Sequence, residues 1–152
     1  MTTEQQAQPT KARVIFLPME YAEAYREPVN MVNLLTEQEG KGNYRREHNF
    51  LRAAVKPDAD KDWYTYDEVV KLVKFVHELP ADKDLVIHCK YGQGRSYTVA
   101  RFIAEQFRDR YRLDTEVKGC QIKNAFVDNQ LLSRLYDAFL DVTLRDPEDI
   151  EA

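Results

Sequence analysis

The chain has 152 residues, which corresponds to about one domain at roughly 150 residues per domain. Charged residues make up 32% of the chain and hydrophobic residues 43%, close to the average of soluble globular proteins, which excludes a collagen-like, disulfide-scaffold or wholly disordered protein. The formal net charge of −4 argues against a nucleic-acid binder, because such proteins are usually strongly basic.

The apolar runs, the N-terminal residues and the cysteines indicate the cellular compartment of the protein. No apolar run approaches the roughly 18 residues that a membrane-spanning helix needs, and residues 1–10 contain no apolar segment typical of a signal peptide. The two cysteines, Cys89 and Cys120, are too few for a disulfide framework. The sequence therefore predicts a cytoplasmic protein with no membrane span.

The distribution of polar residues predicts a single folded unit. Residues 1–12 are polar and are expected to be disordered, and residues 146–152 form an acidic tail. The domain is predicted over 13–145, with no internal repeat or linker inside it.

In the first half of this domain, short apolar runs precede one strong helical pattern. Three runs predict strands, at 14–17, 29–35 and 50–55. A helix is predicted over 66–79, because its apolar residues recur on one face. Thr65 and Glu68 fit a capping box at its start, and Pro80 ends it.

The second half repeats the alternation of strand and helix. The short apolar run at 84–87 is typical of a buried strand. Helical spacing of apolar residues follows from Ser96 to Phe107 and again over 129–143. Strands that alternate with helices predict a layered α/β domain.

The most informative segment is the loop between the strand at 84–87 and the next helix. It reads His88-Cys89-Lys90-Tyr91-Gly92-Gln93-Gly94-Arg95-Ser96. In open sheets ligands bind beyond the carboxyl ends of strands, and a helix N-terminus offers unpaired N–H groups and a positive dipole end. Gly92 and Gly94 allow the backbone to curl, so that several N–H groups converge on one phosphate-sized anion.

Cys89 and Arg95 would lie on either side of that anion. The helix dipole and Arg95 favour the thiolate form of Cys89, which is the nucleophilic form. An arginine can hold two oxygens of one phosphoryl group, which lysine cannot match. The spacing of the two residues alone is a weak signal. With the flanking His88, Ser96 and the two glycines, it favours a nucleophile and an anion clamp over an incidental turn with an inert buried thiol.

This segment resembles the His-Cys-x5-Arg-Ser signature of the cysteine-dependent protein tyrosine phosphatases. The mid-chain position of Cys89 and the small size are similar to the dual-specificity branch and its compact prokaryotic and viral relatives. The resemblance is sharp over 84–104 and looser over 13–143. It implies a central mixed, mainly parallel sheet flanked by helices on both faces. It also implies hydrolysis of phosphomonoesters through a cysteinyl-phosphate, without metal or cofactor, by a monomer whose substrate is a phosphorylated protein.

The resemblance implies a role for each residue of the loop. Cys89 would be the nucleophile, Arg95 the phosphate clamp, and Ser96 the hydroxyl that stabilises the departing thiolate. His88 would support the loop, and Asn129 resembles an asparagine that braces it from the next helix. The residues expected to contact the substrate are Lys90, Tyr91, Gly92, Gln93, Gly94 and Arg95.

Family members also carry a general-acid aspartate about thirty residues before the cysteine. Asp58 matches best in spacing, with Asp60 and Asp62 as further candidates; the other reading of this segment is a solvated acidic turn. A general acid matters because an alkoxide or phenoxide leaves poorly, and positioned proton transfer typically contributes about 10²–10⁴-fold to the rate.

Several alternatives remain open. A phosphoinositide phosphatase of the same superfamily is one, although Gln93 stands where those enzymes often place a second lysine. A non-catalytic phosphate-binding module, a rhodanese-like sulfurtransferase, an arsenate reductase and a purely structural protein are others. Cys120 is either a resolving thiol or a half-buried helix residue, and His48 and His77 are expected at the surface. No cluster of ligand residues has zinc-site spacing.

Overall fold

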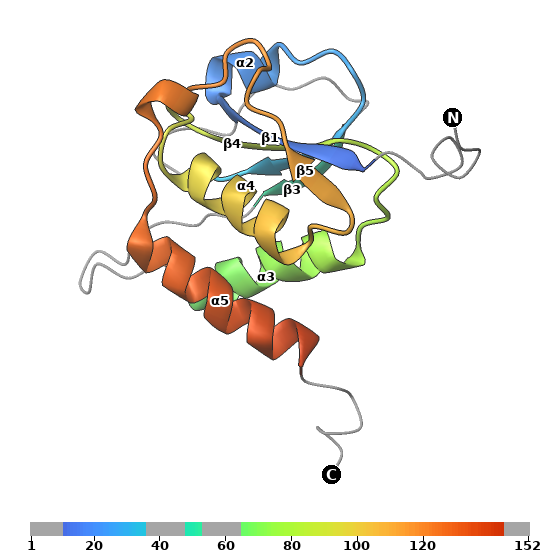
Figure 1. Cartoon of the computed structure of the whole chain (residues 1–152), viewed down its shortest axis with the longest axis vertical. Helices are drawn as coiled ribbons and strands as arrows, with labels where there is room; N and C mark the ends of the chain where they lie inside the picture. Colours follow the sequence, from blue (N-terminus) through green and yellow to red (C-terminus); the bar gives the residue numbers. More distant parts are fainter. Residues whose placement is uncertain (1–10, 36–47, 53–64, 145–152) are drawn as a thin grey trace, which may run out of the picture.

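A computed structural model of the chain describes residues 11–35, 48–52 and 65–144 (Figure 1). Its centre is a five-stranded sheet with the order β3-β2-β4-β1-β5, and all pairings between these strands are parallel. The strands are Ala12–Pro18 (β1), Asn30–Asn33 (β2), Asn49–Arg52 (β3), Leu85–Cys89 (β4) and Tyr111–Leu113 (β5). The predicted α/β class with a mainly parallel sheet is confirmed.

Helices cover both faces of the sheet. They are Met19–Glu23 (α2), Tyr66–Glu78 (α3), Arg95–Gln106 (α4), Asn129–Thr143 (α5) and a short 3₁₀ helix, Ile122–Asn124 (η2). The helices α3, α4 and α5 pack on one face, and α2 lies on the other (Figure 1).

Strand β1 shows how the apolar runs build two cores. Side chains of successive strand residues point to opposite faces. Val14 and Phe16 accordingly join the large core under α3, α4 and α5. Ile15 and Leu17 join the smaller core on the side of α2. Both faces are buried, which is why this strand is a continuous apolar run rather than an alternating one.

Most predicted elements are present, with differences at their ends. Helix α5 has the predicted bounds, and α3 begins at Tyr66 as expected. The predicted capping box is wrong in one respect, because the side chain of Thr65 makes no capping hydrogen bond. Helix α4 begins at Arg95, one residue earlier than predicted. Strand β1 begins at Ala12, inside the segment expected to be disordered.

The prediction for His48 is also wrong. This side chain is buried just before β3 rather than exposed. Its Nδ1 accepts a hydrogen bond from the backbone N–H of Val29 (3.3 Å), and its Nε2 lies 3.1 Å from the carbonyl oxygen of Tyr25. These contacts fix the chain where it enters the edge strand.

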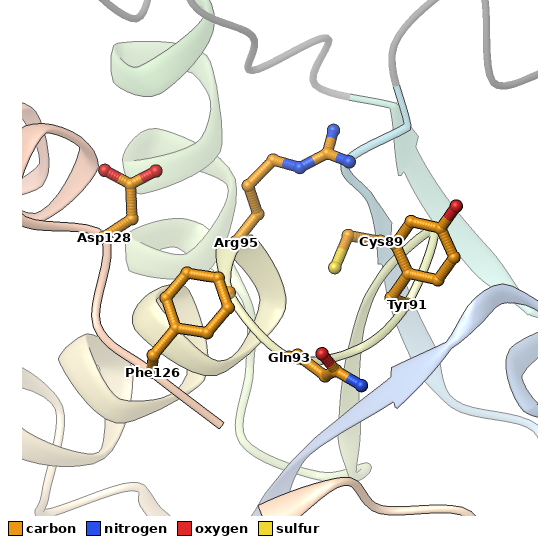
Figure 2. Close-up of a pocket in the computed structure, with 7 residues that line it drawn as sticks. Cys89, Tyr91, Gln93, Arg95, Phe126 and Asp128 are labelled. Carbon is orange, nitrogen blue, oxygen red and sulfur yellow. The ribbon is translucent and has the colours of Figure 1, made fainter. Parts of the chain in front are cut away.

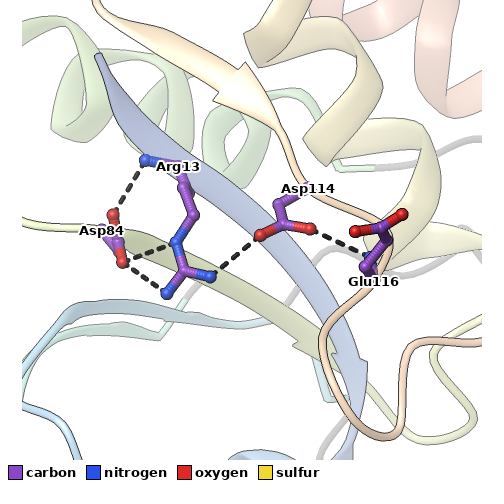
Figure 3. A network of polar contacts seen from close by, with 4 residues as sticks. All are labelled: Arg13, Asp84, Asp114 and Glu116. Atoms are coloured by element: carbon purple, nitrogen blue, oxygen red, sulfur yellow. Dashed lines mark hydrogen bonds and ion pairs between the residues drawn. The ribbon is translucent and has the colours of Figure 1, made fainter. Parts of the chain in front are cut away.

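A polar network joins three segments at the start of β1 (Figure 3). The Arg13 guanidinium donates to Asp84 from Nε (2.9 Å) and Nη2 (2.8 Å), and to Asp114 from Nη1 (2.9 Å). Asp114 also accepts from the backbone N–H of Glu116, and these two partners hold the pKa of the Asp114 carboxyl below its usual value. The network ties the chain before β4 and after β5 to β1.

Candidate active site

The glycine-rich loop lies at the carboxyl edge of the sheet, between β4 and α4. Strand β4 is the central strand, with β2 on one side and β1 on the other. Its last residue, Cys89, pairs with Pro18 at the end of β1, and the carbonyl of Lys90 accepts from the N–H of Met19 (3.3 Å). The loop therefore starts from a rigid, fully buried support, in the place where open parallel sheets bind ligands.

A side chain would clash at both Gly92 and Gly94, but with different parts of the structure. Gly92 has a φ of +69°, and a Cβ there would lie 2.4 Å from the backbone nitrogen of Pro18. A side chain at this position would be strained by both the backbone angle and the close approach. A Cβ on Gly94 would lie 2.6 Å from the ring of Phe126. Gly92 is therefore required for the loop to curl beside β1, and the absence of a side chain on Gly94 leaves room for the ring of Phe126.

Cys89 and Ser96 form a buried pair beneath the loop. Cys89 is 3% exposed and Ser96 is fully buried. The Sγ of Cys89 and the Oγ of Ser96 are hydrogen-bonded at 3.3 Å. Ser96 therefore lies where a hydroxyl can stabilise charge on the sulfur. It is not the N-cap of α4, a position that Gly94 occupies.

Arg95 is the first residue of α4 and is half-buried. Its Nη1 donates a 2.7 Å hydrogen bond to the carbonyl oxygen of Leu34, directly after β2. The bond holds the guanidinium across the carboxyl edge of the sheet. Because an arginine has five N–H donors in a planar fork, one anchored guanidinium can still bind two oxygens of an anion.

A cavity of about 230 Å³ opens above the Cys89 thiol (Figure 2). It is lined by Cys89, Tyr91, Gln93, Gly94, Arg95, Phe126 and Asp128. Drug-sized ligand sites are roughly 300–1,000 Å³, so this cavity suits one small functional group. A second cavity, of about 420 Å³, shares Tyr91 and Gln93 with the first and is lined by Lys90 as well. Lys90 is thus beside the first cavity and not in its wall.

Sequence reasoning missed the segment before α5. The N–H of Phe126 donates to the carbonyl oxygen of Gln93 (2.9 Å), which brings the segment against the loop. The buried hydroxyl of Thr98 donates to the carbonyl oxygen of Gly94 (2.8 Å) and accepts from the N–H of Asp128 (2.8 Å). About thirty residues separate Asp128 from Thr98 in the chain, so no local sequence pattern signals this contact.

The structure does not bring Asn129 to the loop as predicted. Asn129 is exposed at the start of α5 and lines a different cavity, beside Arg101 and Glu105. Asp128 caps α5, accepting from the N–H of Leu131 (3.1 Å). The link between the loop and the start of α5 that was expected of Asn129 is made by Thr98, which bonds to Gly94 and to Asp128.

The predictions for the acid candidates, for Cys120 and for His77 differ in how they compare with the structure. The acid candidates Asp58, Asp60 and Asp62 lie outside the described residues, so their assignment stays a prediction. Cys120 is half-buried as expected, but it lies in a loop before η2 and not in a helix. His77 is exposed, as predicted.

His88 is fully buried in the sheet, beside Leu17 and Asn33 in the strand register. Burial lowers the pKa of its imidazole, a hydrogen bond with the backbone of Cys89 partly opposes this, and the nearby Arg95 charge adds to the lowering, which together bring the pKa to about 4. The side chain is therefore neutral at pH 7, which suits a supporting role rather than that of a proton shuttle.

The lowered pKa predicts acid sensitivity of the fold. Between pH 6.5 and 4 the unfolded chain binds a proton at His88 that the folded chain does not, so the free energy of unfolding falls as the pH falls. We expect His88 to lower the free energy of unfolding by about 3 kcal/mol by pH 4, at 1.36 kcal/mol per pKa unit. Urea unfolding at several pH values measures this loss.

The comparison for this experiment is His88→Gln, which removes the buried titrating group. Its free energy of unfolding should change less between pH 6.5 and 4 than that of the wild type, whatever its value at pH 7. The control is His77→Gln, which removes an exposed imidazole instead. Equal pH dependence in wild type and His88→Gln would contradict the assignment.

Two other properties bear on the site. Within 11–35, 48–52 and 65–144, no group of three or more His, Cys, Asp or Glu residues is placed to hold a metal ion. Over the same residues, no helix is long and apolar enough to cross a membrane.

Comparison of the chain with protein-family models, with curated proteins and with solved structures found no significant match.

Proposed function

We propose that this protein is a phosphomonoester hydrolase of the protein tyrosine phosphatase type, which acts through a cysteinyl-phosphate. The observation that carries the proposal is the pairing of a buried thiol with a buried hydroxyl at 3.3 Å beneath a glycine-rich loop, with Arg95 on the wall of the same small cavity. Each of these groups has a use in phosphoryl transfer: Cys89 and Arg95 line one cavity, and Ser96 contacts the thiol from the buried side.

In the first step, the Cys89 thiolate attacks phosphorus opposite the ester oxygen. The S–P bond forms as the P–O bond to the leaving group breaks, and the leaving oxygen takes a proton from the general acid, for which Asp58 is the first candidate. Arg95 and the N–H groups at the start of α4 hold the other phosphoryl oxygens. Phosphoryl transfer relies mainly on such positioning and charge stabilisation.

In the second step, water attacks the cysteinyl-phosphate. The same aspartate, now a base, accepts the proton of the water, the S–P bond breaks, and inorganic phosphate leaves. The sulfur departs with a negative charge, which the Ser96 hydroxyl stabilises by donating its hydrogen bond to Sγ. Splitting one difficult displacement into two easier ones is the usual advantage of a covalent intermediate.

The buried serine favours an enzyme over a module that only binds phosphate. Binding an anion requires the loop N–H groups and Arg95, but it has no use for a hydroxyl directed at the sulfur. The Cys89 thiol donates to the oxygen of the buried Ser96 side chain. Once the thiol is ionised, the same hydroxyl can donate to the sulfur, as a reaction in which the sulfur gains and loses charge requires.

The proposed function is tested by turnover of a substrate panel with the purified protein. The panel comprises phosphotyrosine, phosphoserine and phosphothreonine peptides, phosphoinositides, and thiosulfate. We expect release of inorganic phosphate from phosphopeptides. Turnover of phosphoinositides alone would support the other phosphatase class, sulfur transfer from thiosulfate would support a sulfurtransferase, and no turnover would overturn the proposal.

The general acid is tested by its dependence on the leaving group. Asp58→Asn should slow hydrolysis of a phosphotyrosine peptide, whose phenol has a pKa near 10, by about 10²–10⁴-fold. It should slow an activated aryl phosphate far less, because that leaving group departs without a proton. Values of kcat/KM for the two substrates provide the measurement.

Asp60→Asn and Asp62→Asn are the matched controls. We expect the leaving-group-dependent loss at Asp58 alone. The same loss at Asp60 would place the acid two residues further along, and an equal loss on both substrates would mean that the aspartate only shapes the loop.

A further inference from the structure

A second cavity adjoins the one above the Cys89 thiol. Its volume is about 420 Å³, compared with about 230 Å³ for the first, and both are lined by Tyr91 and Gln93 (Figure 2). The other walls of the second cavity come from the end of β1, the start of α2, Lys90 and Gln121. A phosphoryl group held over Cys89 therefore leaves the rest of its substrate beside a second, larger cavity.

Two opposite charges line this second cavity without pairing. Glu20 is exposed in the first turn of α2, and Lys90 is half-buried directly after Cys89. Among the residues that the structure describes, neither side chain has an ion-pair or hydrogen-bond partner. Their backbones are held close together, because the N–H of Met19 donates to the carbonyl oxygen of Lys90 (3.3 Å). Both charges are therefore available to a ligand.

A bound phosphoryl group decides which of these two charges the rest of the substrate can pair with. A phosphorylated side chain carries a charge of about −1.5 to −2 at pH 7, and Lys90 and Arg95 are the two cations of the loop that binds it. The bound anion offsets the charge of Lys90 and repels a second anion. Of the described residues that line the second cavity, Glu20 is the one with a negative charge. The occupied site therefore attracts a cation to Glu20.

We propose that the second cavity is a subsite for a basic side chain near the phosphorylated residue of the substrate, and that Glu20 recognises this side chain. The subsite rests on the proposed function. It narrows the substrate from phosphorylated protein in general to sequences with an arginine or lysine one or two positions from the phosphorylated residue. An extended chain advances about 3.3–3.6 Å per residue, so a side chain at such a position can reach a cavity that adjoins the catalytic one.

Hydrolysis of matched phosphotyrosine peptides tests the subsite. The peptides carry arginine, glutamine or glutamate at one of the two positions before or the two positions after the phosphotyrosine. At one or more of these positions, we expect KM to be about threefold to fivefold lower for arginine than for glutamine, as one exposed ion pair allows. Glutamate should give the highest KM, and kcat should stay nearly the same in the series. High salt should remove the preference, because it screens exposed charges.

Substitutions at Glu20 identify the carboxylate as the recognising group. Glu20→Gln should make the KM values of the arginine and glutamine peptides equal, and Glu20→Lys should reverse the order of the arginine and glutamate peptides. The ratio of two KM values within one variant does not depend on how much of that variant is folded. The matched control is Glu78→Gln, which removes an exposed carboxylate at the end of α3, on the other face of the sheet from α2, and should leave the preference for arginine intact.

The outcomes separate the subsite from the proposed function. If the peptides are hydrolysed with equal KM values at all four positions, the subsite is wrong and the phosphatase proposal stands. A preference for glutamate would mean that Lys90 is the recognising charge, and a preference for arginine that persists in Glu20→Lys would assign recognition to another group; either result overturns the subsite. If no peptide is hydrolysed, the proposed function fails and the subsite fails with it.

Discussion

Cys89→Ser should abolish turnover of phosphotyrosine peptides, with a loss on the order of 10⁶-fold in kcat, as is typical when the nucleophile of a covalent enzyme is removed. A hydroxyl in place of the thiol is not ionised at neutral pH and cannot form the cysteinyl-phosphate. The proposed anion cradle would consist of backbone N–H groups and Arg95, so it should survive the change. Phosphate release measures the loss, and calorimetric titration with inorganic phosphate or vanadate measures the retained binding.

The matched control is Cys120→Ser, because Cys120 is the other free cysteine and packs against both cores. This variant should retain near wild-type turnover if the thiol at 120 has no part in the reaction. Near wild-type activity in Cys89→Ser would refute the phosphatase assignment. Loss of activity in both variants would point to a redox or structural link between the two thiols.

Arg95→Lys should lower kcat/KM by about 10²–10³-fold, the usual cost of removing one preorganised group that stabilises charge in the transition state. The substitution keeps the positive charge but loses the planar fork. A lysine cannot bond to the carbonyl of Leu34, as Arg95 does at 2.7 Å, and hold two phosphoryl oxygens at the same time. Steady-state kinetics on one aryl phosphate checks the prediction.

Arg112→Lys provides the comparison for Arg95→Lys. Arg112 is exposed in the middle of β5, and the change there should leave kcat/KM within about twofold of the wild type. Equal losses at the two positions would mean that Arg95 acts only through its charge or through the packing of α4, and the clamp role would be wrong.

The anchoring of Arg95 also connects the site to the fold. Leu34, which holds the guanidinium, follows β2 directly, and its N–H donates to the carbonyl of His88 (2.9 Å). The end of β2 is therefore hydrogen-bonded both to the strand that carries Cys89 and to the arginine. Mutations that loosen this strand end should affect anion binding even though they touch no substrate.

The main features of the fold were predictable from local patterns. The one-sided apolar residues of α3 and α5 reflect the helical period of 3.6 residues, and the continuous apolar run of β1 reflects a strand that is buried on both faces. Such patterns are visible in a single segment. Strand β5 was missed because it has three residues with Arg112 at its centre, and its pairing with β1 outweighs its weak local preference.

In the candidate site, too, some features could be predicted from the sequence and others could not. The loop from His88 to Ser96 is contiguous, so its glycines, thiol and arginine could be recognised together, and the structure brings Cys89, Ser96 and Arg95 around one place. The role of Thr98 and the ring of Phe126 could not be inferred. Phe126 meets the loop, and Asp128 meets Thr98, only because the chain returns through η2 to the start of α5. Asn129, predicted from its distance along the chain, is exposed at that start.

By itself, the sequence determined the α/β class of the fold, the bounds of α5 and the position of a glycine-rich loop after a buried strand. These depend on residues that are neighbours in the chain, where periodicity and spacing carry the information. Only the tertiary structure decided that His48 is buried, that Leu34 anchors Arg95, and that Phe126 lies against Gly94. Each of these contacts joins residues at least 19 positions apart or on different elements. The path of the chain, which depends on how all the elements pack, is what brings such residues together.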